Sequence, residues 1–262
     1  METTITVLLP TYNAGRYLLK ALHSVFTQTI SHWQIIIIDD ASTDNSINLA
    51  KYYTDDSRVT LLRNPINLGQ SKSLNLGLTL SQTAYTVQLD SDDWFNPDTL
   101  EVLYTAAESS ADTIALFSGN LNLVIENEEG NLIMEEIWRN RSFNERYDFL
   151  LADCSQWPRF YRTTALKEIG GWPTDDPYEG RYMEDKRILL RLIENSEFLW
   201  LDHVLYNHRR HSGNQTNLTQ IYNEMTEWTI RDALNRWGDK FNPVFKKDLF
   251  GRMRLVSLIP KS

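Results

Sequence analysis

The feature that most constrains the fold is the run of four isoleucines at 35–38, which ends at Asp39 and Asp40. β-Branched residues without polar alternation are typical of a strand buried on both faces. Strands of this kind that alternate with helices indicate a parallel sheet covered by helices on both sides, and hence an open α/β fold. Further short apolar runs, separated by segments with helical spacing of apolar residues, lie at 5–9, 59–62 and 85–89.

A group of acidic residues directly follows the fourth run, at Asp90, Ser91, Asp92 and Asp93. The carboxyl ends of parallel strands form one rim of the sheet, where ligands of such folds bind. Hard divalent cations take oxygen ligands, and a bound diphosphate can complete their shell. The motif therefore predicts a metal and nucleotide site, although an Asp-rich turn with a helix cap would produce the same pattern.

The second half of the chain is less regular. Strand-like runs lie within 113–137, a helical pattern occupies 184–193, a last strand is expected at 198–206, and the pattern from Tyr222 onward is helical. The 262 residues suffice for one sizeable core with a small appendage.

Charge and composition exclude several classes of protein. A net charge of −9 argues against general nucleic-acid binding, which needs a basic surface. The single cysteine, Cys154, fits a reducing compartment. No apolar run approaches the roughly 18 to 20 residues that span a bilayer. We therefore expect a cytoplasmic protein, either soluble or peripheral at the inner face of the membrane.

The last segment, 236–262, differs from the rest in charge. It holds seven Lys and Arg residues against two Asp, a net charge of +5, and aromatic residues are interleaved with them. Such a segment can lie on anionic lipid. The alternative is a helical appendage that packs on the main domain.

Seven short motifs occur in an order that resembles one known family. They are LLPTYN at 8–13, IIIIDDASTD at 35–44, NLGQSKSLNLG at 67–77, LDSDD at 89–93, GGW at 170–172, ED at 184–185 and RRHSGNQT at 209–216. In this order they resemble the family 2 glycosyltransferases of the GT-A fold, which are inverting, nucleotide-sugar-dependent enzymes. The last motif departs from the family pattern, because His208 stands where an aromatic residue is common.

The resemblance implies a domain organisation. A GT-A (Rossmann-like) domain with a mostly parallel central sheet would occupy 1–216. Its nucleotide-binding half would be about 1–95 and its acceptor-side half about 96–216. A helical C-terminal extension would follow at 217–262.

The resemblance also implies a donor site. Tyr12 would lie against a base, Asp40 would accept a hydrogen bond from an imide N–H such as that of uracil, and Arg209 or Arg210 would pair with a phosphate. Asp92 would bind a divalent metal, Mn²⁺ or Mg²⁺, with His211 as its partner. The residues implied in nucleotide binding are Pro10, Thr11, Tyr12, Asp40, Lys72, Asp90, Ser91 and Arg209. Packing at the sheet edge, helix capping and a solvated Lys72 are the structural alternatives.

On the acceptor side, the resemblance implies that Asp185 is the general base, with Glu184 as second choice. An apolar wall such as Trp172 would raise the pKa of a nearby carboxyl. Gly171 and Trp172 would present an aromatic face to a sugar. The alternatives are an acidic pair favoured by the helix dipole and a tryptophan packed in the core.

The implied function is transfer of a sugar from a UDP-type donor to a hydroxyl of a carbohydrate, glycolipid or surface-polymer acceptor. A sugar-phosphate nucleotidyltransferase and a non-catalytic nucleotide-sugar or glycan-binding module are the alternatives. A dinucleotide-dependent oxidoreductase is disfavoured because no G-x-G-x-x-G follows the first strand.

Overall fold

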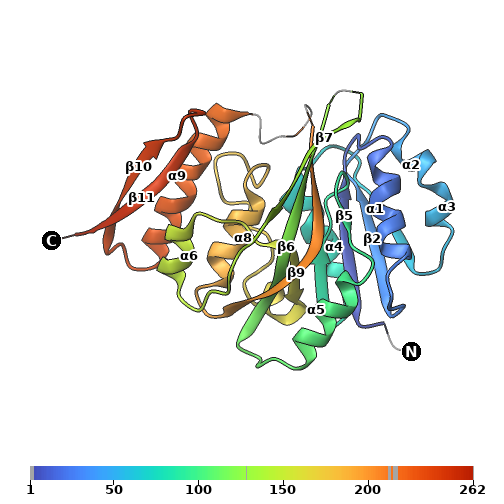
Figure 1. The fold of residues 1–262 in the computed structure, drawn as a ribbon, viewed down its shortest axis with the longest axis horizontal. Coiled ribbons are helices and arrows are strands. Elements are labelled where there is room, and N and C mark those ends of the chain that lie inside the picture. Colours follow the sequence, from blue (N-terminus) through green and yellow to red (C-terminus); the bar gives the residue numbers. More distant parts are fainter. Residues whose placement is uncertain (1–2, 128, 212–213, 215–217, 262) are drawn as a thin grey trace.

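The computed structural model describes residues 3–127, 129–211, 214 and 218–261. Its first half alternates strands and helices much as the sequence predicts (Figure 1). The elements are β1 Ile5–Thr11, α1 Tyr17–Phe26, β2 Trp33–Asp39, α2 Ser46–Leu49, α3 Lys51–Thr54, β3 Val59–Arg63, α4 Gln70–Leu80, β4 Tyr85–Gln88, β5 Trp94–Phe95 and α5 Thr99–Glu108.

The second half contains longer strands and the remaining helices. Its elements are β6 Ile114–Glu126, β7 Leu132–Trp138, α6 Arg146–Ala152, β8 Trp157–Arg162, α7 Thr163–Glu168, α8 Glu184–Leu192, β9 Glu197–Arg210, α9 Thr219–Arg236, β10 Phe241–Lys247 and β11 Met253–Pro260. None of the helices in the described ranges is long and apolar enough to cross a membrane.

One large sheet runs through both halves in the order β3-β2-β1-β4-β8-β6-β9-β5, and β7 pairs with β6. The predicted parallel pairing holds for β3, β2, β1 and β4. Beyond β4 the sheet is mixed, because β8 is antiparallel to both β4 and β6 whereas β9 is parallel to β6. The parallel order expected of the central sheet therefore does not extend to the second half, where β7 and β8 both run antiparallel to β6.

Alternate residues of the buried strands divide between two cores. Val7 and Ile37 face the cluster that includes residues of α1 and α5. Leu8 and Ile36 face the opposite cluster, which includes residues of α4, α8 and α9. The isoleucine run therefore contributes side chains to the cores on both faces of the sheet, because successive side chains of a strand point to opposite faces.

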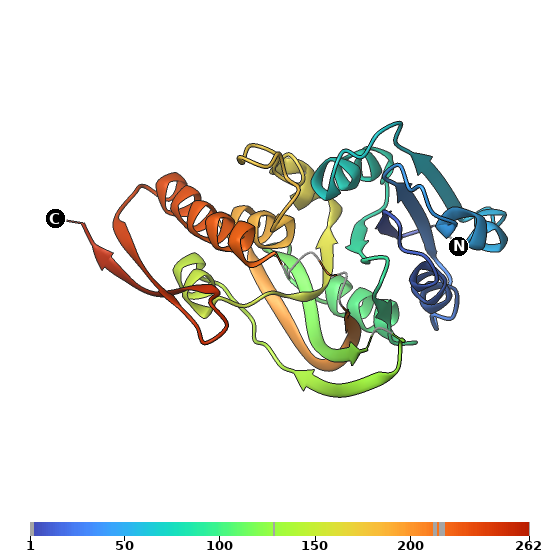
Figure 2. The same cartoon turned by 90° about the horizontal axis from the view of Figure 1, so that it is seen from above.

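The C-terminal segment begins as a helix and ends as a hairpin (Figures 1 and 2). α9 follows the prediction, but β10 and β11 form an antiparallel pair, so the helical extension expected over 217–262 is wrong beyond Arg236. Asp248 stabilises the turn between the strands, since its side chain accepts from the backbone N–H groups of Phe250 and Arg252. Trp237 and Leu255 are buried, which shows that this segment packs on the domain.

Candidate functional site

A cavity of about 970 Å³ lies at the carboxyl ends of β1, β2 and β4. The opposite wall comes from the start of α8, from α9 and from the β10–β11 hairpin. Both halves of the chain therefore contribute to one site, at the rim where open α/β sheets bind ligands.

The end of β1 contributes Pro10, Thr11 and Tyr12 to this cavity, as expected. The Tyr12 ring is 51% exposed, so a planar group can lie against it. Asn13 joins the loops after β1 and β2, because its side-chain oxygen accepts from the backbone N–H groups of Thr43 and Asp44.

Asp40 also lines the cavity, but protein donors already occupy much of its carboxylate. It accepts hydrogen bonds from the backbone N–H groups of Leu68 and Gly69, at 2.7 and 2.8 Å, and from the Asn64 side chain. A carboxylate has about four accepting positions. Donors among the described residues therefore fill three of these positions, which holds the 64–69 loop in place, and leave one unused.

Two residues expected at the nucleotide lie outside the cavity lining. The Lys72 ammonium is paired with the Glu179 carboxylate. The Arg209 guanidinium lies 4.6 and 4.8 Å from the ring centres of Tyr17 and Trp94 and is paired with Glu126. These contacts hold Lys72 and Arg209 away from the cavity, and the next residue, Arg210, lines it instead.

The acidic motif after β4 is held by a network of donors. Asp90 accepts from the side chains of Gln70 and Gln88, each at 3.0 Å. Asp93 is buried and accepts from the backbone N–H of Arg209 at 2.7 Å, and it lies 3.0 Å from Nδ1 of His208. Burial raises the pKa of Asp93 to about 6, and the nearby His208 opposes that rise. Asp93 thus fixes the motif onto β9, and Ser91 and Asp92 line the cavity beside it.

Asp92 and His211 meet in the cavity as the metal hypothesis requires. Oδ2 of Asp92 lies 3.2 Å from Nε2 of His211 and 3.1 Å from the Asn214 side-chain nitrogen. Within the described parts of the chain, no three His, Cys, Asp or Glu side chains are gathered to hold an ion alone. A carboxylate oxygen beside an imidazole nitrogen suits Mn²⁺, provided that a ligand such as a diphosphate completes the shell. The residues therefore fit a shared metal site.

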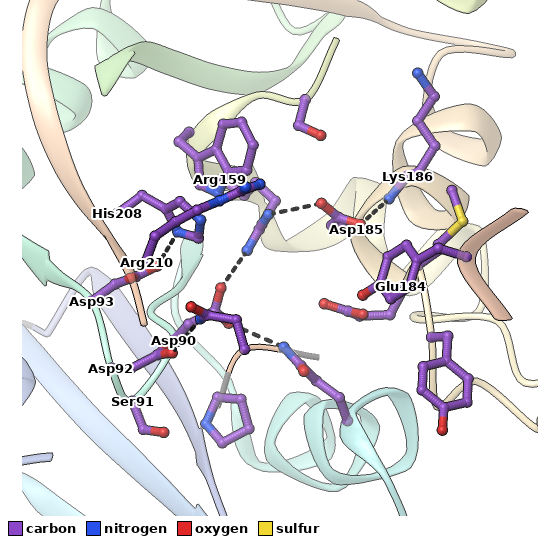
Figure 3. A pocket seen from close by; sticks show the side chains of 18 of the residues that line it. Asp90, Ser91, Asp92, Asp93, Arg159, Glu184, Asp185, Lys186, His208 and Arg210 are labelled. Carbon is purple, nitrogen blue, oxygen red and sulfur yellow. Dashed lines mark hydrogen bonds and ion pairs between the residues drawn. The ribbon is translucent and has the colours of Figure 1, made fainter. Parts of the chain in front are cut away.

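Arg159, which no sequence motif indicated, lies between the two halves of the site (Figure 3). Its guanidinium is 3.0 Å from Oδ2 of Asp90 and 3.4 Å from Oδ2 of Asp185, and its side chain is only 2% exposed. The pairing of Arg159 with Gln88 across β4 and β8 sets this position. The one available signal was an arginine within an apolar strand, since a buried charge needs partners.

Asp185 and Glu184 begin α8 and both line the cavity. The Asp185 side chain is 24% exposed, and its Oδ1 accepts from the backbone N–H of Lys186 at 2.7 Å. Burial, followed by the charges of Asp185 and Asp90, raises the pKa of Glu184 to about 8. Glu184 is therefore mostly protonated at neutral pH, whereas a general base must be ionised.

The expectation for Gly171 and Trp172 is wrong, because neither lines the cavity. Trp172 is 1% exposed and packs edge-to-face on Tyr161, in the core cluster that includes residues of α4, α8 and α9. Gly171 has a positive φ, and a Cβ there would lie 2.4 Å from the Asn75 side-chain oxygen. The Gly-Gly-Trp segment thus turns the chain and fills the core.

Comparison with known proteins places this chain in a family. The model of "Glycosyl transferase family 2" matches residues 6–170. The chain is similar to glycosyltransferase GlyA of Streptococcus pneumoniae, with 28% identity over 90% of this chain and 34% of that protein. Chondroitin synthase of Pasteurella multocida is 27% identical over 88% of this chain and 23% of its own length. The chain thus spans between about a quarter and a third of these curated relatives.

Solved structures share the fold at low sequence identity. S. aureus TarS 1–349 in complex with UDP-GlcNAc has a TM-score of 0.67 and 19% identity, and covers 88% of this chain and 66% of its own. A mannosyltransferase from Pyrobaculum calidifontis in complex with GDP-Man and Mn²⁺ has a TM-score of 0.61 and 15% identity, over 92% of this chain and 72% of its own. The GT-A fold expected from the sequence is confirmed, and the family model argues against the nucleotidyltransferase alternative. The chain belongs to glycosyl transferase family 2, a family of nucleotide-sugar-dependent glycosyltransferases.

Proposed function

We propose that this chain transfers a sugar from a UDP-type donor to a hydroxyl of a carbohydrate acceptor, with inversion at the anomeric carbon. The observation that carries the proposal is the convergence of Asp92 and His211 with Asp185 on one cavity at the strand ends. The similar TarS structure is a complex with UDP-GlcNAc, which supports the uridine assignment. The mannosyltransferase complex with GDP-Man makes GDP the necessary comparison.

In this proposal the β1 and β2 ends hold the nucleoside. Tyr12 lies along the base, and the free accepting position of Asp40 takes an N–H of the base. Asp90, oriented by Gln70 and Gln88, accepts from the ribose hydroxyls. Asp92 and His211 would hold a divalent ion, which when bound supplies positive charge to the departing diphosphate.

Asp185 is the proposed general base. Single displacement needs a carboxylate on the acceptor side, within hydrogen-bond reach of the attacking hydroxyl. Arg159 and the backbone N–H of Lys186 hold the Asp185 carboxylate and stabilise its negative charge. Burial favours the protonated form of Glu184, in which it can donate a hydrogen bond to the acceptor.

Calorimetric titration tests the donor site. UDP and GDP are each titrated with and without Mn²⁺ into the wild type, Asp92→Ala and the control Asp55→Ala, whose aspartate is exposed and outside the cavity. We expect Mn²⁺-dependent UDP binding that Asp92→Ala loses and Asp55→Ala keeps. Absence of UDP binding by the folded wild type would refute the uridine assignment.

The base is tested separately from donor binding. Asp185→Asn should bind UDP normally yet lose transfer to any acceptor that the wild type uses. Proton NMR of the product should show an anomeric configuration opposite to that of the donor. Retention of configuration, or full activity of Asp185→Asn, would contradict the proposed displacement.

We also propose that the hairpin turn contacts a membrane carrying the acceptor. Leu249 is fully exposed and Phe250 is 82% exposed at this turn, and Lys246 and Lys247 precede them. Apolar tips flanked by cations favour anionic lipid surfaces. Co-sedimentation with vesicles that contain phosphatidylglycerol should fall in a Leu249→Ser, Phe250→Ser double variant, and equal sedimentation would argue against this contact.

A further inference from the structure

Seven cationic side chains line the cavity, and five of them have polar partners that account for their position. Arg159 is paired with Asp90 and Asp185, and Arg181 donates to Asn67. The other three pairs are Arg139 with Asp202, Lys186 with Asp153, and Arg254 with Asp153 and Asp248. Among the described residues, the side chains of Arg210 and Arg252 have no hydrogen-bond or ion-pair partner.

Both arginines line the cavity, and the backbone that carries each of them is held in place. Arg210 is the last residue of β9, and its Nε is buried without a hydrogen bond to the described residues. The charge of Arg252 acts on Arg210 across this part of the cavity. The backbone at Arg252 is held by Asp248 on the hairpin and by Asn223 on α9, which accepts from the N–H of Met253 at 2.7 Å. The hairpin therefore presents Arg252 to the cavity from an anchored turn.

The carboxylates at this end of the cavity do not neutralise the pair. Asp153 lies 3.7 Å from the Lys186 ammonium and 3.1 Å from the Arg254 guanidinium, and Asp248 is 3.3 Å from Arg254. Two partly buried like charges repel, so an anion between them would be favoured. The planar guanidinium matches carboxylate and phosphate oxygens with two parallel hydrogen bonds.

The position of the pair points to the acceptor rather than to the nucleoside. The hairpin that carries Arg252 lies at the far end of the molecule from β1, β2 and their helices (Figures 1 and 2). In Figure 3, the Arg210 side chain extends from the acidic motif toward the Asp185 side of the cavity. An anion bound there would lie on the side from which a hydroxyl reaches the proposed base.

We propose that Arg210 and Arg252 form an acceptor subsite for an anionic group, a carboxylate or a phosphate carried by the acceptor glycan. This inference rests on the proposed transferase function, because it assigns the class of acceptor to that same cavity. The acceptor would then be an acidic glycan, and the C-terminal hairpin would determine which glycans are accepted.

The test measures acceptor binding directly, in the presence of saturating UDP and Mn²⁺. Three probes are titrated: neutral maltotetraose, phosphorylated maltotetraose and a uronate-containing tetrasaccharide. The proteins are the wild type, Arg252→Gln, Arg210→Gln and the control Lys240→Gln, which removes one positive charge just before the hairpin and outside the cavity.

We expect the wild type to bind at least one anionic probe about tenfold more tightly than the neutral one, the gain typical of a charge-assisted contact. Both cavity variants should lose this preference and Lys240→Gln should keep it, and the more tightly bound probe shows whether the subsite prefers carboxylate or phosphate. Equal or undetectable binding of all probes, or a preference that survives Arg252→Gln, would overturn the inference. UDP is also titrated with Mn²⁺ into both arginine variants, and weakening of UDP binding alone would assign the pair to the donor and overturn the inference. The preceding UDP titration detects failure of the transferase proposal independently.

Discussion

Replacement of Arg159 by methionine should destabilise the protein in a pH-dependent way. At an effective dielectric constant of about 20, charges 3.0 and 3.4 Å apart attract by about 5 kcal/mol per pair. Desolvation of the buried guanidinium opposes much of this attraction, and removal of one partner of a buried pair costs about 3–5 kcal/mol. Because Asp90 and Asp185 are about a quarter exposed, we expect about 3 kcal/mol at pH 7.

The pH dependence distinguishes lost charge from lost packing. Burial raises the pKa of Glu184 and Arg159 lowers it, so removal of Arg159 raises that pKa further in the folded state. A pKa raised on folding gives stability that is present at low pH and lost as pH rises. The deficit of the variant should therefore grow as pH rises from 7 to about 9, through the pKa of Glu184 at about 8.

Urea denaturation of the wild type, Arg159→Met and Arg162→Met at both pH values measures this difference. Arg162 lies on the same strand, but its strongest contacts are with main-chain oxygens such as that of Ile114, so its deficit should not change with pH. An Arg159→Met deficit below about 1 kcal/mol, the range of a surface pair, or one equal at both pH values would refute the reasoning.

Three further predictions concern single side chains. Burial raises the pKa of Glu184 from 4.5 to about 8, so the folding stability of the wild type should fall as pH rises between those values. The melting temperature of Glu184→Gln should therefore rise relative to that of the wild type between pH 5 and pH 8. Trp172→Ala should cost about 3–5 kcal/mol in urea denaturation while its UDP affinity stays unchanged, and a selective loss of acceptor binding would contradict the buried position. Lys72→Ala should change the free energy of unfolding by less than about 1 kcal/mol, because its ion pair is exposed. Titration of this variant should give the UDP affinity of the wild type, and a large loss of UDP affinity would support the nucleotide role of Lys72.

The first half of the fold could be predicted because its signals are local. The isoleucine run and the helical periods around it specify strand, helix and strand order without reference to distant residues. The second half depends on pairing between distant segments, such as β4 with β8 and β6 with β9, which no local pattern encodes. The sequence does not predict the hairpin at 241–260 for a related reason. Its strands are stabilised by packing on the core cluster that includes residues of α4, α8 and α9, which are distant in the sequence.

The residues of the candidate site also fall into two groups, those that the sequence located and those that it did not. The carboxylates of the two motifs were located from the sequence, since Asp92 and Asp185 both reach the cavity. Lys72, Arg209 and Trp172 were misplaced because sequence spacing does not give side-chain direction, and each has a partner or a core position elsewhere. Arg210 was an open alternative for the phosphate role, and the structure places it, rather than its neighbour, in the cavity.

Arg159 explains why neither half of this site can be understood alone. Its position opposite Gln88 places one guanidinium nitrogen on Asp90, at the proposed ribose contact, and another on Asp185, the proposed base. A ligand that draws Asp90 away from Arg159 changes the charge that the guanidinium offers to Asp185, because one cation serves both carboxylates. Donor binding and acceptor activation would then be electrostatically coupled through a residue that touches neither reacting atom.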